Sequence, residues 1–238
     1  MDTWRTWELV LPRLERRHEV LAPALGGHAG GPTLNGDLAD GVERAMDEAG
    51  FDTAHIVGNS LGGYVGLLLA ARGRARTVVA FAPAGGWAVG DDSFQRTLAL
   101  QAEVHERTKA AVPRVDEIVA SPEGRRRATR YITVNYEHIP AELVAHQILG
   151  VAHCQAVPAL IERARREGWP LDAERIDCPV RIVWGTEDAL LPWPRAADRY
   201  RSEWLPHVDW VELDGVGHCP QLDVPLETAE LILEFTAR

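Results

Sequence analysis

Short apolar runs of strand length alternate along the chain with longer stretches whose apolar residues recur at helical spacing. This alternation predicts the α/β class, with a mostly parallel, doubly wound sheet covered by helices on both faces. The expected strands are 18–23, 53–57, 77–81, 180–184 and 209–213. The expected helices of this core are 7–16, 37–49, 61–72, a stretch near 194–204, and 224–236.

The alternation stops between about residues 91 and 169. There, helical patterns such as 94–108 and 141–152 follow one another with no strand-like run between them. We therefore predict a core in two parts, residues 1–90 and 171–238, interrupted by a helical insertion at 91–170.

The sequence Gly58-Asn59-Ser60-Leu61-Gly62 matches the pattern G-x-S-x-G between an expected strand and an expected helix. A serine on so sharp a turn adopts a strained backbone, and flanking glycines let the strand and helix approach closely. The turn also leaves the Leu61 amide at the positive helix terminus, where it can stabilise an oxyanion. An ordinary Gly-rich turn with a capping serine is the alternative interpretation.

Serine needs a base to remove its proton, and the base needs an acid to hold its tautomer. Asp188 follows the expected strand 180–184, and His218 follows the strand 209–213 in a Gly-rich loop, so both would lie at the carboxyl edge of the sheet. Glu187 is the neighbouring alternative for the acid. Taken singly, a loop histidine or a capping aspartate is more often structural than catalytic, but the order Ser, Asp, His, each after a strand, favours catalysis.

These motifs resemble those of the α/β-hydrolase superfamily over nearly the whole chain. Residues 58–62 are similar to its nucleophile elbow, 185–192 to its acid loop, and Gly217-His218 to its histidine loop. The resemblance implies that the insertion is a lid over the active site. Residues 22–28 resemble the stretch after the family's fourth strand, which gives His28 a role in shaping that loop.

The sequence departs from this family at its amino end. The family has a strand and a His-Gly loop, which supplies a second oxyanion donor, before the helix that residues 3–7 resemble. That strand lies between those ending at Pro23 and Gly58, so we expect an N-terminally truncated fold with a gap beside the nucleophile. We also expect that a chain expressed from Met1 is poorly soluble or weakly active until upstream residues are restored.

Composition narrows the possible partners. The 238 residues are 46% hydrophobic and carry a net charge of −10, which disfavours nucleic acid and anionic membranes. No apolar run is long enough to span a bilayer and no signal peptide is apparent, so we expect a cytoplasmic protein. The three cysteines lack metal-site spacing, and no dinucleotide fingerprint is present, so neither a metal nor another cofactor is expected. The oligomeric state stays open.

We therefore expect a serine hydrolase that cleaves a carboxylic ester or related acyl bond of a small apolar substrate through an acyl-enzyme. Carbon–carbon bond hydrolysis and cofactor-free perhydrolysis are alternatives within the same fold. A catalytically weak or silent binding protein is the alternative from another class. The catalytic residues would be Ser60, Asp188 and His218, with the Leu61 amide as oxyanion donor, and the expected substrate-binding residues are Asn59, Trp87, Phe94 and Tyr131.

Overall fold

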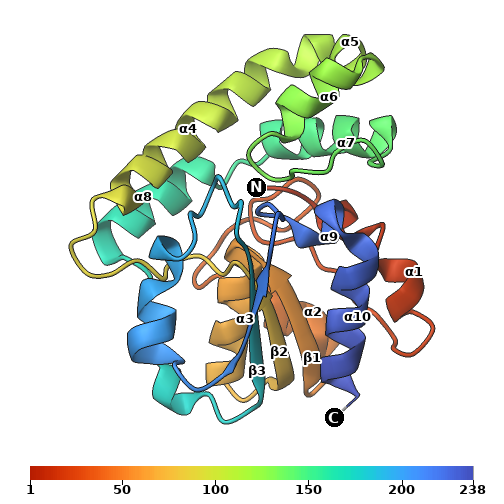
Figure 1. The fold of residues 1–238 in the computed structure, drawn as a ribbon. Helices are drawn as coiled ribbons and strands as arrows, with labels where there is room; N and C mark the ends of the chain where they lie inside the picture. The colour runs from red at the N-terminus through yellow and green to blue at the C-terminus, as the bar shows by residue number, and fades with distance from the viewer. Residues whose placement is uncertain (238) are drawn as a thin grey trace.

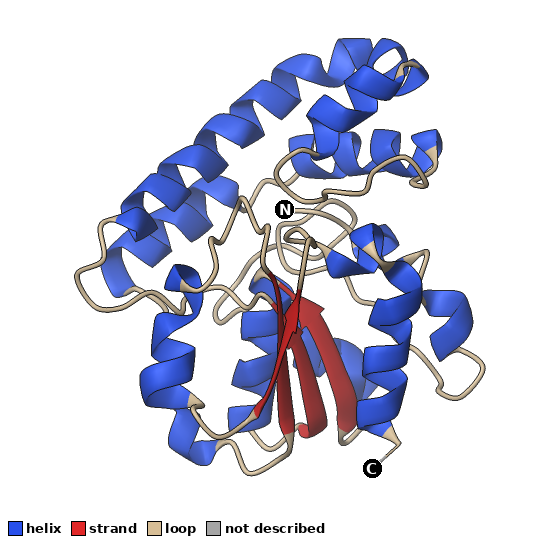
Figure 2. Cartoon of the chain, in the orientation of Figure 1, coloured by secondary structure: helices blue, strands red, loops and turns tan. Residues whose placement is uncertain are grey.

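A computed structural model describes residues 1–237 and places a parallel sheet at the centre of the molecule (Figure 2). Over these residues the sheet has four strands, in the order β1-β2-β3-β4, and every neighbouring pair is parallel. The strands are β1 (Ala54–Asn59), β2 (Ala75–Phe81), β3 (Val180–Gly185) and β4 (Asp209–Leu213). The predicted α/β class is confirmed, and the carboxyl ends of all strands meet at one edge of the sheet.

Two hydrophobic cores lie on opposite faces of this sheet, because successive side chains of a strand point to opposite sides. On one face, Val78 and Ala80 of β2 pack with α3 (Leu61–Ala71) and the segment 195–205. On the other face, Val79 and Phe81 pack with α1 (Leu11–Leu14) and α10 (Pro225–Thr236). The helix α2 (Asp40–Glu48) packs against α3 at the side of the sheet.

The helical insertion, residues 93–167, lies above the carboxyl ends of the strands, and the amino terminus lies beneath it (Figure 1). Its helices are α4 (Ser93–Ala111), α5 (Val115–Ala120), α6 (Pro122–Thr129), α7 (Ala141–Ala152) and α8 (Val157–Glu167). No single helix within residues 1–237 is long and apolar enough to cross a membrane, although α7 and α8 pass that test together as a pair bent by 63°.

The segment 18–23, predicted to be a strand, is not one. Residues 19–25 have no ladder partner, and within the described chain β1 is paired only with β2. Residues 18–25 and β1 line one cavity instead of bonding to each other. An apolar run forms a strand only where a neighbouring strand takes up its backbone groups, and among residues 1–237 no strand pairs with this one. The other predicted strands are confirmed.

Two predicted helices are broken into short pieces. The stretch 7–16 keeps one turn, α1, after a 3₁₀ turn at Trp4–Trp7. The stretch near 194–204 becomes a 3₁₀ turn at Arg195–Ala197 followed by a π-helical turn at Tyr200–Trp204. Both segments still place apolar side chains on the sheet. The apolar spacing therefore predicted the buried face correctly but overestimated the length of each helix.

The turn from β1 into α3 depends on a close approach of backbones. A Cβ added to Gly58 would lie 2.2 Å from the Gly62 carbonyl oxygen, whereas one added to Gly62 would meet nothing within 4 Å. A Cβ on Gly66 would lie 3.1 Å from the Ile56 side chain, so α3 also packs tightly on β1. Of the two glycines that flank the serine, only Gly58 is required by packing.

We expect Gly58→Ala to destabilise the fold by about 3 kcal/mol, since the clash is with backbone that cannot rotate away. A loss of that size lowers the melting temperature by roughly 6 to 12 °C in a chain of this length. Gly62→Ala is the matched control and should melt within about 2 °C of the wild type or slightly above it, because alanine favours a helix. Equal melting temperatures for the two variants would contradict this packing.

Candidate active site

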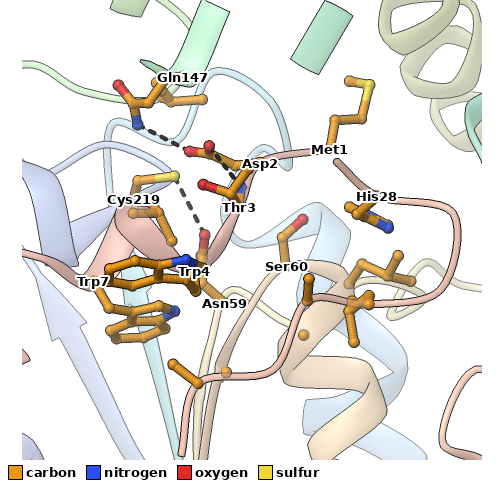
Figure 3. A pocket seen from close by; sticks show the side chains of 18 of the residues that line it. Met1, Asp2, Thr3, Trp4, Trp7, His28, Asn59, Ser60, Gln147 and Cys219 are labelled. Atoms are coloured by element: carbon orange, nitrogen blue, oxygen red, sulfur yellow. Dashed lines mark hydrogen bonds between the residues drawn. The ribbon is translucent and has the colours of Figure 1, made fainter. Parts of the chain in front are cut away.

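Ser60 lies at the turn between β1 and α3 with a strained backbone, φ 56° and ψ −118°. The backbone N–H of Ser60 donates to the Phe81 carbonyl (2.8 Å), and its carbonyl accepts from the Ala84 N–H (3.0 Å). Both partners belong to the end of β2 and the loop after it, so this strand holds the turn in place. The half-buried side chain of Ser60 faces a cavity (Figure 3).

Leu61 is the first residue of α3, so its N–H belongs to the helix's first turn, where amides have no intrahelical partner. This amide lies directly after Ser60 and at the positive end of the helix dipole. The predicted oxyanion donor is thus placed at the helix terminus that the sequence indicated.

Asp188 and His218 are brought together from loops after β3 and β4. Nδ1 of His218 lies 2.7 Å from Oδ2 of Asp188, and the residues are 2% and 4% exposed. The other carboxylate oxygen, Oδ1, accepts from the backbone N–H groups of Leu190 (2.9 Å) and Leu191 (2.7 Å). These two bonds orient the carboxylate toward the imidazole. Glu187, the alternative acid, is exposed.

Nε2 of His218 is buried and has no hydrogen-bond partner within residues 1–237. His218 and Ser60 line the same cavity. If Nδ1 carries the proton shared with Asp188, Nε2 is a free acceptor. A buried nitrogen in that state is suited to take a proton from a hydroxyl group or water in the cavity, and hydrogen bonds of this kind often form only once a substrate is bound.

Asn59 was predicted to bind substrate, but its side-chain amide is bonded to protein groups instead. Its Nδ2 donates to the carbonyls of His218 (2.9 Å) and Phe81 (3.2 Å). Its Oδ1 accepts from Cys219 Sγ (3.3 Å) and Gln221 Nε2 (3.2 Å). Asn59 borders the cavity, but its polar atoms tie the serine turn to the histidine loop. The sequence could not show this because the partners in the histidine loop lie about 160 positions away.

The cavity has a volume of about 1070 Å³ and extends from beneath the helical insertion, past Ser60, to the free side of β1. From the insertion it is lined by apolar side chains, by Tyr131, which was predicted to face the substrate, and by charged and polar residues that include Arg107, Arg127 and Gln147. The apolar residues include Ile118, Ile132, Val144, Ile148 and Val151. The volume lies just above the usual range for small-molecule sites, about 300–1,000 Å³.

Trp87 and Phe94, also predicted to bind substrate, do not line this cavity. Their rings pack on each other with centroids 5.2 Å apart, and both join the core beneath the start of the insertion. Large apolar side chains at the junction of two layers gain most by packing between them. The two aromatics therefore anchor the insertion.

Residues at the amino end also line the cavity, which no local pattern in the sequence indicated. The side chain of Thr3 bonds through Oγ1 to Nε2 of His146 (2.8 Å), and Gln147 Nε2 donates to Asp2 Oδ2 (2.9 Å). Figure 3 shows Met1, Asp2 and Thr3 above Ser60. Residues 1–3 thus form part of the cavity wall between α7 and the serine turn.

His28 is buried in the loop 24–31 and faces the cavity, with Nδ1 3.3 Å from the Gly26 carbonyl oxygen. Burial lowers the pKa of His28 to about 4, so the ring is neutral near pH 7. The bond to Gly26 agrees with the loop-shaping role expected from the sequence. Among the described residues, no group of three or more His, Cys, Asp or Glu could hold a metal ion.

Both the sequence and the fold of this chain resemble those of known proteins. A sequence model described as the alpha/beta hydrolase family matches residues 1–231. The chain is similar to epoxide hydrolase EphH of Mycobacterium tuberculosis, with 35% identity over 206 residues that cover 83% of this chain and 92% of that protein. It is also similar to a pimeloyl-[acyl-carrier protein] methyl ester esterase of Neisseria meningitidis, with 28% identity covering 95% of this chain and 85% of the esterase.

A solved structure of a thermophilic esterase from Thermogutta terrifontis superposes with a TM-score of 0.71 at 18% identity, covering 99% of this chain and 86% of that one. At this identity the likeness concerns the fold alone. The family match over nearly the whole chain, together with the relative at 35% identity, is what decides the assignment. This chain therefore belongs to the alpha/beta hydrolase family of enzymes.

Proposed function

We propose that the enzyme is a serine hydrolase of carboxylic esters, with Ser60 as nucleophile, His218 as base and Asp188 as acid. The observation that carries this proposal is the buried pair of His218 and Asp188, whose bonded atoms are 2.7 Å apart. Nε2 of His218 has no partner within residues 1–237, and His218 lines the same cavity as the strained Ser60. Serine, base and acid are the three parts that acyl transfer to a hydroxyl group requires.

In the proposed reaction, Ser60 Oγ attacks the ester carbonyl carbon while Nε2 of His218 accepts the hydroxyl proton. The negative charge that develops on the carbonyl oxygen is stabilised by the Leu61 N–H. Collapse of this intermediate breaks the bond to the alcohol, which leaves with the proton from His218. Water then enters, gives a proton to His218, and its oxygen attacks the acyl-enzyme, which releases the acid and restores Ser60.

Asp188 acts on this cycle through His218. Because its Oδ1 is held by two backbone amides, Oδ2 is fixed toward Nδ1 and keeps the proton on that nitrogen. The carboxylate also stabilises the imidazolium that forms when Nε2 is protonated. The apolar side chains of the insertion that line the cavity favour an acyl group or alcohol of low polarity.

A serine nucleophile favours esters over epoxides, although one relative is named an epoxide hydrolase. Attack of Ser60 on an epoxide carbon would form an ether, and an ether has no carbonyl carbon for an activated water to attack. Attack on an ester forms an acyl-serine, which water can hydrolyse. An aryl epoxide assayed beside p-nitrophenyl esters separates the two, and we expect turnover of the esters alone.

We expect Ser60→Ala to abolish covalent labelling by a fluorophosphonate probe and to reduce ester turnover by at least about 10³-fold, because no other group replaces the nucleophile. Ser202→Ala, which changes an exposed serine outside the cavity, is the matched control and should label and turn over like the wild type. Labelling that persists in Ser60→Ala would move the nucleophile elsewhere.

Substitution of the two acids in the loop after β3 should have very different effects on kcat. Asp188→Asn should lower kcat on the order of 10⁴-fold, because the amide no longer fixes the correct tautomer of His218. Glu187→Gln alters an exposed side chain and should change kcat by less than about twofold. Steady-state kinetics on a p-nitrophenyl ester measures both, and similar small effects would refute the assignment of the acid.

A further inference from the structure

Asp223, at the end of α9 (Pro220–Asp223), is a buried carboxylate that the proposed reaction does not use. It is 2% exposed and accepts four hydrogen bonds. Oδ2 accepts from the backbone N–H groups of Gly217 (2.6 Å) and Val134 (3.0 Å). Oδ1 accepts from the backbone N–H (2.6 Å) and side-chain Nδ2 (3.0 Å) of Asn135. All four donors are amide N–H groups.

These donors belong to two parts of the molecule that are about 80 residues apart. Gly217 directly precedes His218, while Val134 and Asn135 belong to the segment between α6 and α7 of the helical insertion. The two parts also touch directly, since the Cys219 N–H donates to the Ile132 carbonyl (2.8 Å). Asp223 therefore bridges the insertion and the histidine loop.

The packing around Gly217 shows how close the two parts lie. A Cβ on Gly217 would stand 3.0 Å from both the Ile132 carbonyl oxygen and Thr133 Cα. Backbones this close leave little room for water to replace the carboxylate. A buried carboxylate whose lone pairs are filled by N–H groups forms strong, directional bonds, and removing one oxygen leaves buried amides without acceptors.

Together these contacts fix the backbone on both sides of His218. Asp223 accepts a hydrogen bond from the N–H of Gly217, the residue before His218. Asn59 donates to the carbonyl of His218 itself, and the Ile132 carbonyl accepts from the N–H of Cys219, the residue after His218. The bond to Asp188 orients the ring, but the position of the ring depends on the backbone that carries it. Misplacement of a catalytic group by about 1 Å can cost on the order of 10²-fold in rate.

We propose that Asp223 is a positioning residue that couples the two parts, so that His218 is aligned for catalysis when the segment 132–135 of the insertion is docked on the histidine loop. The inference rests on the proposed function, because it concerns the alignment of the proposed base. In this proposal the insertion has two roles, because it covers the cavity and also holds His218 in position.

The test compares Asp223→Asn with the wild type in three measurements. An asparagine keeps the shape but offers one acceptor oxygen in place of two. We expect kcat on a p-nitrophenyl ester to fall roughly 10- to 100-fold, with a smaller change in KM. Labelling of Ser60 by a small fluorophosphonate should slow by a similar factor, and the low-field proton NMR resonance of the His218–Asp188 bond should broaden or shift.

Two control variants separate positioning from general stability. Asp209→Asn, on β4 and away from the cavity, breaks the paired bonds to the buried Arg181 on β3. It should lower the melting temperature while leaving kcat unchanged. Asn135→Ala removes one side-chain donor but keeps both backbone donors of the segment, so its kcat should stay within about threefold of the wild type.

The proposal is overturned if Asp223→Asn melts lower but keeps wild-type kcat, labelling rate and proton resonance, because Asp223 would then be merely structural. Failure of the proposed function has a different signature, since the wild type itself would neither label nor turn over esters. In that case amide hydrogen exchange still decides the coupling. If the amides of Gly217, Val134 and Asn135 all exchange faster in Asp223→Asn, the coupling is supported. Faster exchange in the histidine loop alone, or in the insertion segment alone, contradicts it.

Discussion

The strained backbone of Ser60 is the constraint on which the rest of the site depends. A positive φ at a non-glycine residue costs on the order of 1–3 kcal/mol and persists only where the surroundings enforce it. Here the end of β2 enforces it through bonds to Phe81 and Ala84, and the absence of a side chain on Gly58 lets α3 begin against the strand. The same turn aims the Ser60 hydroxyl into the cavity and leaves the Leu61 amide at a helix terminus. Packing of the sheet thus determines where the nucleophile lies.

The position of the histidine depends on more distant parts of the chain. Asn59 connects the histidine loop to the serine turn through its bond to the His218 carbonyl. This bond fixes the backbone of the proposed base relative to that of the nucleophile. Asp223 connects the same loop to the insertion. Parallel strands bring the serine, acid and histidine loops to one edge of the sheet, but these side-chain bonds set the loops relative to one another. A site assembled from loops needs such cross-links because loops have little regular hydrogen bonding of their own.

The sequence predicted the sheet and the pairing of Asp188 with His218, because each feature has a local signal. Apolar runs marked the strands, and the loops after β3 and β4 held an acid and a histidine in the expected order. The strand at 18–23 was wrong because strand formation depends on a partner that a local pattern does not reveal. Trp87 and Phe94 were assigned to the substrate, yet their rings pack on each other, since apolar character alone does not distinguish a core from a cavity wall. Asp223 went unnoticed because its four donors come from positions 134, 135 and 217, which only the fold brings together.

The central claim is that an acyl group passes through Ser60. The most direct measurement mixes the enzyme with a slowly hydrolysed p-nitrophenyl ester, quenches it in acid, and maps the acylated peptide by mass spectrometry after tryptic digestion. Residues 45–72 form one tryptic peptide that contains Ser60 and no other serine or cysteine. The account predicts the acyl mass on this peptide, located at Ser60, in proportion to the burst of p-nitrophenol. An acyl group on another residue, or a burst without any covalent adduct, would contradict it.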